Sequence, residues 1–121
     1  MANSGRGGGN SVTELSPSGQ PLSPDQSGFT GGGLHIPEAV AIDGAGHVWV
    51  ANRGSVTELD STGAPLSPAS GFIASGGNLG LGIAIDAAGD VWVLGSSHSG
   101  VEFVGLAAPV ATPLIGPAHL P

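Results

Sequence analysis

The sequence contains no cysteine and no lysine, and each absence removes a class of chemistry. Without cysteine there are no disulfides, no thiolate metal sites and no thiol nucleophiles. The basic side chains are two arginines, against nine carboxylates, which gives a formal net charge of −7. Because phosphate backbones and anionic membranes are bound by clustered Lys and Arg, we expect neither nucleic acid nor a membrane surface as a partner.

Long apolar runs are absent as well. No stretch approaches the ~18 apolar residues that cross a bilayer. The N-terminal MANSGRGGGN lacks the apolar region of a signal peptide. Localisation therefore stays open, because a leader could precede this segment in a longer bacterial protein, which would then be secreted or periplasmic.

Glycine and proline are abundant, with 23 and 10 residues of 121. The composition is nevertheless not that of a disordered chain, because 40% of the residues are hydrophobic and only 9% are charged. Many short strands joined by tight turns have this composition. The sequence therefore predicts an all-β fold.

An internal repeat organises most of the chain. The segment SVTELSPSGQPLSP (11–24) matches SVTELDSTGAPLSP (55–68) at 10 of 14 positions, with an offset of 44. AVAIDGAGHVWV (39–50) matches GIAIDAAGDVWV (82–93) at 8 of 12, with an offset of 43. A period in the low forties is typical of a repeat that forms one small sheet per copy.

Strands can be assigned within one period. VAID (40–43) alternates between larger and small side chains, with Val40 and Ile42 on one face and Ala39 and Ala41 on the other. D-x-x-G then closes a hairpin with HVWVAN (47–52), because Asp caps a turn and Gly accepts the positive φ that follows it. A third strand is expected at SVTELD (55–60), and a weaker fourth strand at 64–73, where two prolines favour an outer edge. Trp49 and Trp92 are expected to pack between adjacent sheets.

The pattern P-x-x-V-A-I-D-x-x-G-x-V-W-V-A-N, residues 37–52, resembles the NHL repeat and its relatives in six-bladed bacterial propellers such as streptogramin lyase. The resemblance covers about residues 9–114 and implies antiparallel four-stranded blades of a β-propeller, about two and a half of them. The segments expected are a flexible Gly-rich N-terminus (1–10), a partial blade of outer strands (11–36), a complete blade (37–79), a last blade (80–114) and a tail (115–121).

Two and a half blades cannot close a ring, so open strand edges are expected. The chain begins at a third strand in this interpretation, and residues 105–114 are expected to form the final outer strand. Either the chain is the C-terminal fragment of a longer protein, or it is a homo-oligomer in which three chains of two blades close the ring. We favour the fragment.

The resemblance also implies where a ligand would bind, at the mouth of the central channel. The candidate ligand-binding residues there are His35, Glu38, Asn52 and Arg53. In streptogramin-lyase-like propellers, His and Glu in this neighbourhood act with a divalent metal. One His and one Glu are too few for an acid–base site, so no catalytic residue is assigned.

The remaining polar residues are interpreted structurally. Asp43 and Asp86 recur as turn caps, His47 is interpreted as a solvent-facing surface histidine, and Glu14 and Glu58 recur on the third strand as part of the repeat. No metal site and no cofactor is assigned. The sequence favours a non-enzymatic module that binds protein, peptide or glycan, and a metal-dependent lyase resembling streptogramin lyase is the alternative.

Overall fold

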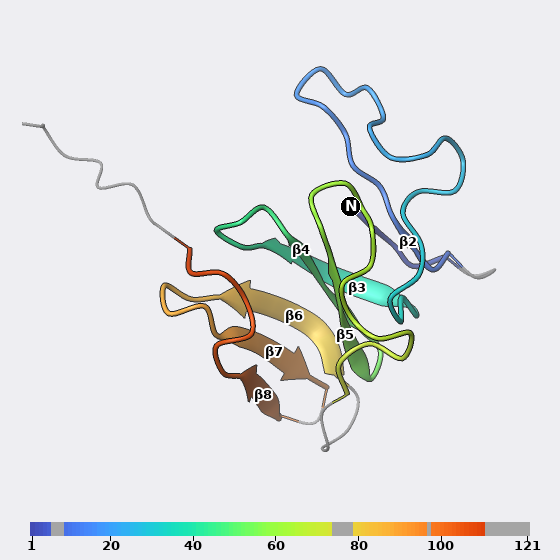
Figure 1. Ribbon diagram of the computed structural model, residues 1–121. Coiled ribbons are helices and arrows are strands. Elements are labelled where there is room, and N and C mark those ends of the chain that lie inside the picture. Colours follow the sequence, from blue (N-terminus) through green and yellow to red (C-terminus); the bar gives the residue numbers. More distant parts are fainter. Residues whose placement is uncertain (6–8, 74–78, 97, 111–121) are drawn as a thin grey trace, which may run out of the picture.

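The computed structural model describes residues 1–5, 9–73, 79–96 and 98–110, which form strands and turns without a helix (Figure 1). The all-β prediction is therefore confirmed. No helix in this described part is long and apolar enough to cross a membrane. The strands are β1 (Ala2–Asn3), β2 (Ser11–Val12), β3 (Pro37–Ile42), β4 (Val48–Asn52), β5 (Ser55–Leu59), β6 (Leu79–Ile85), β7 (Val91–Gly95) and β8 (Gly100–Phe103).

The two copies of the repeat build the same sheet twice. The strand orders are β3-β4-β5 and β6-β7-β8, with every neighbouring pair antiparallel. The tryptophans occupy the same register in the two sheets: Trp49 lies opposite Ala41 and Glu58, and Trp92 lies opposite Ala84 and Glu102. Each sheet also has a bulge at the start of its first strand.

The fourth strand predicted at 64–73 is wrong as a continuous element. This segment pairs with β5 only at two isolated bridges, Leu59 with Pro65 and Val56 with Phe72. The Leu66 amide also donates to the Glu58 carbonyl at 2.9 Å. Proline has no N–H to donate to a ladder. Between the bridges the Ser67 hydroxyl accepts a hydrogen bond from the Glu58 amide at 3.0 Å, so a side chain replaces part of the missing backbone pairing.

The first sheet contains a strand that the sequence interpretation missed. Ala2 and Asn3 pair with Val12 and Ser11, within the segment expected to be a flexible N-terminus. The pairing repeats that of Ala51–Asn52 with Ser55–Val56 in the middle sheet. MAN at the start of the chain is thus a short counterpart of VAN at the end of β4, and the first sheet does not begin at its third strand.

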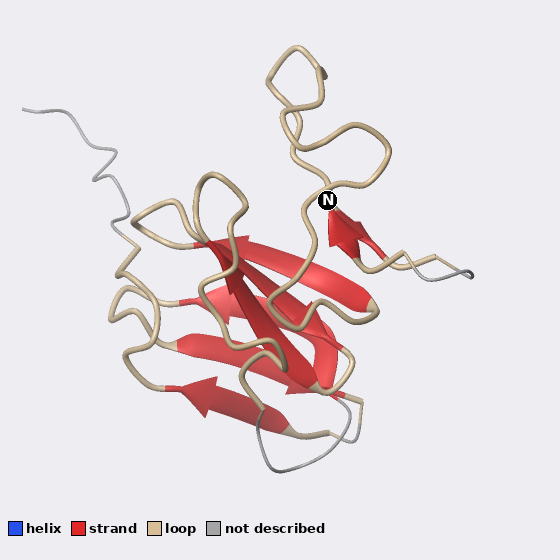
Figure 2. Ribbon diagram, turned by 45° about the vertical axis from the view of Figure 1, so that its right-hand side comes forward, coloured by secondary structure: helices blue, strands red, loops and turns tan. Residues whose placement is uncertain are grey.

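The core lies on both sides of the middle sheet. Figure 2 shows the strands of the sheets lying close together. One side packs against the third sheet through Trp49, Ala51, Val56, Leu79, Val91 and Val93. Trp49 also stacks on Phe72 with ring centroids 5.9 Å apart. The other side carries Val50 and Leu59 against Val12 and Leu34.

The two tryptophans differ in burial although they share a register. Trp49 has no exposed surface, whereas Trp92 is 46% exposed. The expectation that tryptophan packs between sheets is therefore confirmed for Trp49 and wrong for Trp92. The reason is that, among the described residues, no further sheet covers the outer face of the third sheet.

The expected final outer strand is also wrong over its described part. Residues 105–110 form no strand on β8, and instead cross the hairpin turns of the second and third sheets (Figure 1). The Ala107 amide donates to the Gly89 carbonyl at 3.0 Å, and the Gly44 amide donates to the Ala108 carbonyl at 3.2 Å. A side chain at Gly44 would collide with the Pro109 carbonyl. Residues 111–114 lie outside the described part.

Candidate functional site

The four predicted site residues lie near one another but do not form one site. His35 and Arg53 line a hollow of about 380 Å³. Glu38 lines a separate, smaller hollow of about 50 Å³, where Arg53 is again a wall. The bulge between Pro37 and Ala39 leaves Glu38 exposed. Arg53 is thus shared between two hollows, while His35 and Glu38 are not brought together.

Arg53 sits in the tight turn between β4 and β5. Its amide lies 3.2 Å from the His35 carbonyl and 3.3 Å from the Ile36 carbonyl. The residue is exposed, and no carboxylate of the described chain lies within ion-pair distance of its guanidinium. The guanidinium is therefore available for an anionic group from outside.

The loop that carries His35 is held in a strained conformation. Ile36 has a φ of 47°, a left-handed conformation that β-branched residues rarely adopt. Its amide donates to the Asn10 side-chain oxygen at 2.9 Å. Strain of this kind persists only where surrounding contacts enforce it, and it is concentrated at binding and catalytic sites.

Asn52 positions this loop and has no surface of its own to offer. The residue is fully buried. Its amide nitrogen donates to the Thr57 hydroxyl at 2.9 Å, and its side-chain oxygen accepts the His35 amide at 3.2 Å. The Thr57 hydroxyl in turn donates to the Gly32 carbonyl at 2.8 Å. Asn52 therefore holds the His35 backbone in place and has no exposed surface.

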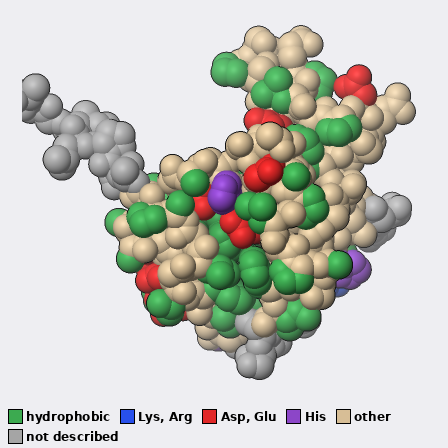
Figure 3. Space-filling view, in the orientation of Figure 1, with side chains coloured by type: hydrophobic (Ala, Val, Ile, Leu, Met, Phe, Trp, Pro, Cys, Tyr) green, Lys and Arg blue, Asp and Glu red, His purple; other side chains and the backbone are tan. Residues whose placement is uncertain are grey.

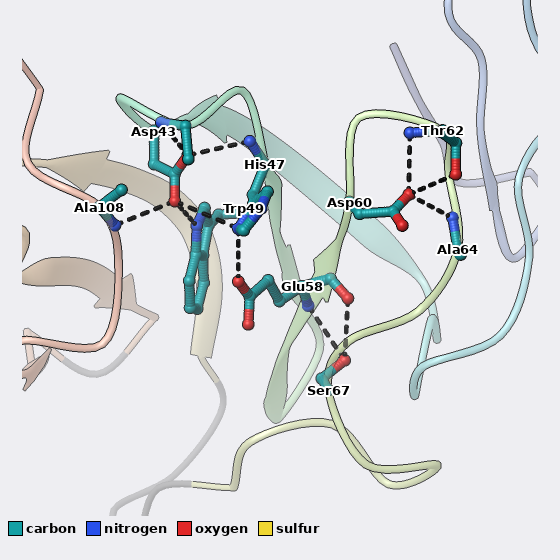
Figure 4. Close-up of polar contacts among 10 residues, drawn as sticks. Asp43, His47, Trp49, Glu58, Asp60, Thr62, Ala64, Ser67 and Ala108 are labelled. Atoms are coloured by element: carbon teal, nitrogen blue, oxygen red, sulfur yellow. Dashed lines mark hydrogen bonds and ion pairs between the residues drawn. The ribbon is translucent and has the colours of Figure 1, made fainter.

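A second polar cluster, Asp43, His47 and Glu58, was missed as a unit (Figure 4). The His47 Nδ1 lies 3.0 Å from the Glu58 carboxylate and 3.7 Å from the Asp43 carboxylate. In the space-filling view, one histidine lies among acidic side chains on this face (Figure 3). The His47 side chain is 32% exposed and its Nδ1 faces the Glu58 carboxylate, so the residue reaches the surface and also takes part in this cluster.

The hairpin register brings this cluster together. Glu58 lies opposite Trp49, and His47 precedes Trp49 by two residues, so the alternation of strand side chains places His47 on the same side. The sequence signal was the Glu on the third strand combined with the D-x-x-x-H spacing. That signal becomes readable only when the strand register is known.

Asp43 is the most heavily engaged carboxylate of the cluster. One oxygen accepts the Ala45 and His47 amides, both at 2.9 Å, and the other accepts the Trp49 indole N–H at 3.1 Å and the Ala108 amide at 3.0 Å. Burial opposes ionisation, but these donors, Ala108 foremost, outweigh it and hold the pKa of Asp43 below its usual 3.8. The turn-capping prediction is confirmed.

Asp, His and Glu are ligand types of divalent-cation sites. One ligand atom from each of the three residues lies within 4.8 Å of the others. Asp43 argues against that use. Its two oxygens already accept four N–H bonds, so a cation would have to displace the Trp49 indole or the Ala108 amide. The arrangement is suited to tying the turn, the third strand and the C-terminal segment together.

The third sheet repeats only part of this arrangement. Asp86 caps its turn by accepting the Ala88 and Asp90 amides at 2.9 and 3.0 Å, and it accepts the Trp92 indole N–H at 3.1 Å. Asp90 stands where the middle sheet has His47, and its carboxylate accepts the Gly105 amide. The comparisons add no name to these sites, because no protein family model, no curated protein and no solved structure matches this chain.

Proposed function

We propose that the chain is a β-propeller repeat module of the NHL-like kind, with a non-enzymatic binding role. The observation that carries the proposal is the repetition of one sheet in identical register, with the second copy stacked on the tryptophan side of the first. Successive blades of a propeller are related in this way. In such an architecture the loops between strands serve as the binding surface.

The hollow lined by His35 and Arg53 is the binding site in this proposal. Arg53 supplies the one Lys or Arg side chain of the described residues, in a chain of net charge −7. A guanidinium presents a planar set of donors that matches a carboxylate in two parallel hydrogen bonds. The ligand class that fits is therefore a carboxylate-bearing peptide segment of a partner protein.

Pre-organisation supports this assignment. The Asn52 side chain fixes the His35 backbone, and Asn10 holds the strained Ile36 next to it. A loop already fixed in its bound conformation loses less entropy when a ligand arrives. The hollow therefore has a fixed wall, although it is formed by a loop.

The alternative, a metal-dependent lyase resembling streptogramin lyase, requires His35 and Glu38 to converge on one metal. Their separation into two hollows counts against it. A calorimetric titration with Mg²⁺ and with Mn²⁺ tests it directly. Binding that is abolished by Glu38→Ala would defeat the scaffold proposal in favour of the lyase.

The peptide proposal is tested by titrating the ¹⁵N-labelled protein with Ac-Gly-Glu-Asp-Gly-NH₂, and with the neutral Gln/Asn counterpart. We expect amide shifts concentrated at residues 33–35 and 53–55 with the acidic peptide alone. Arg53→Gln should abolish these shifts, while Arg6→Gln, which removes the same charge elsewhere in the sequence, should retain them. Equal shifts with the neutral peptide, or none with either, would refute the proposal.

A further inference from the structure

The outer face of the third sheet is largely apolar, and no other sheet of the described residues packs on it. In register on this side lie Ala84, Trp92 and Leu94, called the Trp92 face below. Trp92 is 46% exposed and Leu94 is 60% exposed. The neighbouring strand residues on the same side include glycines 82 and 100, so another sheet can approach closely.

The chain itself contains the interface that such a face makes. On the middle sheet the equivalent side carries Ala41, Trp49 and Ala51, and the third sheet covers it so completely that Trp49 has no exposed surface. The covering surface is the valine side of the third sheet, where Val91 and Val93 are almost fully buried. A tryptophan side of this repeat therefore packs on a valine side of the next sheet.

The valine side of the middle sheet is covered by the first sheet at Val50 and Leu59, but it keeps open area beside β3. Between the middle sheet and the first sheet lies a groove of about 400 Å³, called the β3 groove below. Val40, Ile42 and Val48 line one wall, and Val12 and Phe29 line the other. Ile42 is 54% exposed. By register, Val40, Ile42 and Val48 are the counterparts of Ile83, Ile85 and Val91, the residues that pack with Trp49 inside the chain.

We infer that a second copy of this chain docks head-to-tail, with its Trp92 face in the β3 groove of the first. The occupant follows from the internal interface, because Val40, Ile42 and Val48 are the counterparts of residues that pack with Trp49, and the Trp92 face is the counterpart of the Trp49 side. They belong to opposite sides of the stack, so one molecule cannot pair its own two surfaces. Such a heterologous contact closes into a ring or grows further.

The indole N–H of Trp92 already has a hydrogen-bond partner within the chain. It donates to the Asp86 carboxylate at 3.1 Å, as the buried Trp49 indole donates to Asp43 at 3.1 Å. Covering the Trp92 ring therefore leaves no indole donor without a partner, which is the usual cost of burying tryptophan. This inference does not rest on the proposed peptide site, since Arg53 and His35 lie in neither surface.

Charge opposes this contact in dilute salt. Glu102 is in register with Trp92, and Glu14 and Asp60 line the β3 groove, so both surfaces carry negative charge. Salt screens exposed charges over a Debye length of about 10 Å at 0.1 M. Association should therefore strengthen as NaCl is raised, unlike an association driven by opposite charges.

Light scattering after size exclusion, at several protein and NaCl concentrations, tests the inference. The wild-type chain should rise to at least twice the monomer mass, whereas Trp92→Glu and Ile42→Glu should each stay at the monomer mass. Each variant keeps one intact surface, so an equimolar mixture should give twice the monomer mass and nothing larger. Leu66→Glu, at a 49% exposed site outside both surfaces, is the matched control and should associate like the wild type.

Circular dichroism of each variant confirms that it is folded before its mass is interpreted, and both substituted side chains are already half exposed. A wild-type chain that stays monomeric at every concentration overturns the inference. Self-association of Trp92→Glu overturns it too, because the proposed face would then be irrelevant. A mixture that stays monomeric overturns the head-to-tail arrangement.

Discussion

Removing the Asp43 carboxylate should destabilise the fold far more than removing its counterpart Asp86. Both residues cap a turn through one oxygen and accept an indole N–H through the other. Asp43 differs from Asp86 in being buried and in accepting a fourth hydrogen bond. Asp43 has a fully buried side chain and also accepts the Ala108 amide, whereas the Trp92 indole that donates to Asp86 is exposed to water.

The magnitude follows from the donors that would be orphaned. In Asp43→Ala, the Trp49 indole and the Ala108 amide lose their acceptor where water has little access. A buried donor without a partner costs about 1–3 kcal/mol, so the two donors together cost about 2–6 kcal/mol, to which the lost turn cap adds. In Asp86→Ala, water replaces the carboxylate at exposed donors, so the loss should be clearly smaller.

Urea unfolding of the two variants, followed by circular dichroism, measures this contrast. Asp43→Asn is informative as well, because Asn retains the turn-capping oxygen but presents an amide to the Trp49 and Ala108 donors. It should therefore approach the loss seen in Asp43→Ala. Equal losses in Asp43→Ala and Asp86→Ala would refute the reasoning, because burial of the carboxylate would then have no consequence.

The same carboxylate sets a pH dependence whose sign is fixed. The pKa of Asp43 in the folded chain lies below the usual 3.8. Its contribution to stability is therefore complete above pH 3.8 and is lost as the pH falls through the lower, folded pKa. The wild-type chain should lose stability in acid more steeply than Asp43→Asn does. Parallel curves for the two proteins below pH 4 would contradict this assignment.

Five further substitutions test other parts of the structure. Trp49→Ala should cost about 3–5 kcal/mol in urea unfolding, whereas Trp92→Ala in the monomer should lie within about 0.5 kcal/mol of the wild type. Asn52→Ala should cost about 2–3 kcal/mol because its buried amide partners lose their bonds, and Asn3→Ala at the half-buried counterpart should cost less. Gly44→Ala should accelerate amide exchange in residues 105–110 without accelerating it in β4, and unchanged exchange would show that this segment does not lie on the turn.

The repeated core was predictable because it is written in local patterns. The D-x-x-G turns and the period-2 alternation around Trp49 and Trp92 fix two hairpins and their register. These signals depend on residues a few positions apart. They required no knowledge of which sheet lies next to which.

The errors arose where distant segments decide the outcome. The burial of Trp49 and the exposure of Trp92 depend on whether another sheet covers each face, which the matching local sequences do not specify. Residues 105–110 left β8 because Gly44 and Asp43, more than 60 positions away, offer a flat surface and an acceptor. Such a contact has no local pattern.

The sequence predicted which residues lie near the candidate site but not the role of each residue. Exposed His35 and Arg53 do line one hollow, but the role of Asn52 depends on a hydrogen bond to the His35 backbone 17 residues away. The cluster of His47 and Glu58 depends on the pairing of β4 with β5. Both features follow from strand register and not from motif spacing.

The central claim is that the third sheet seals the tryptophan side of the middle sheet. Fluorescence quenching by acrylamide in Trp92→Phe, which leaves Trp49 as the single tryptophan, measures this most directly. A blue-shifted emission that acrylamide barely quenches in the folded chain, and quenches freely in urea, is the predicted result. Emission at the wavelength of free tryptophan, quenched equally with and without urea, would contradict the stacking of the two sheets.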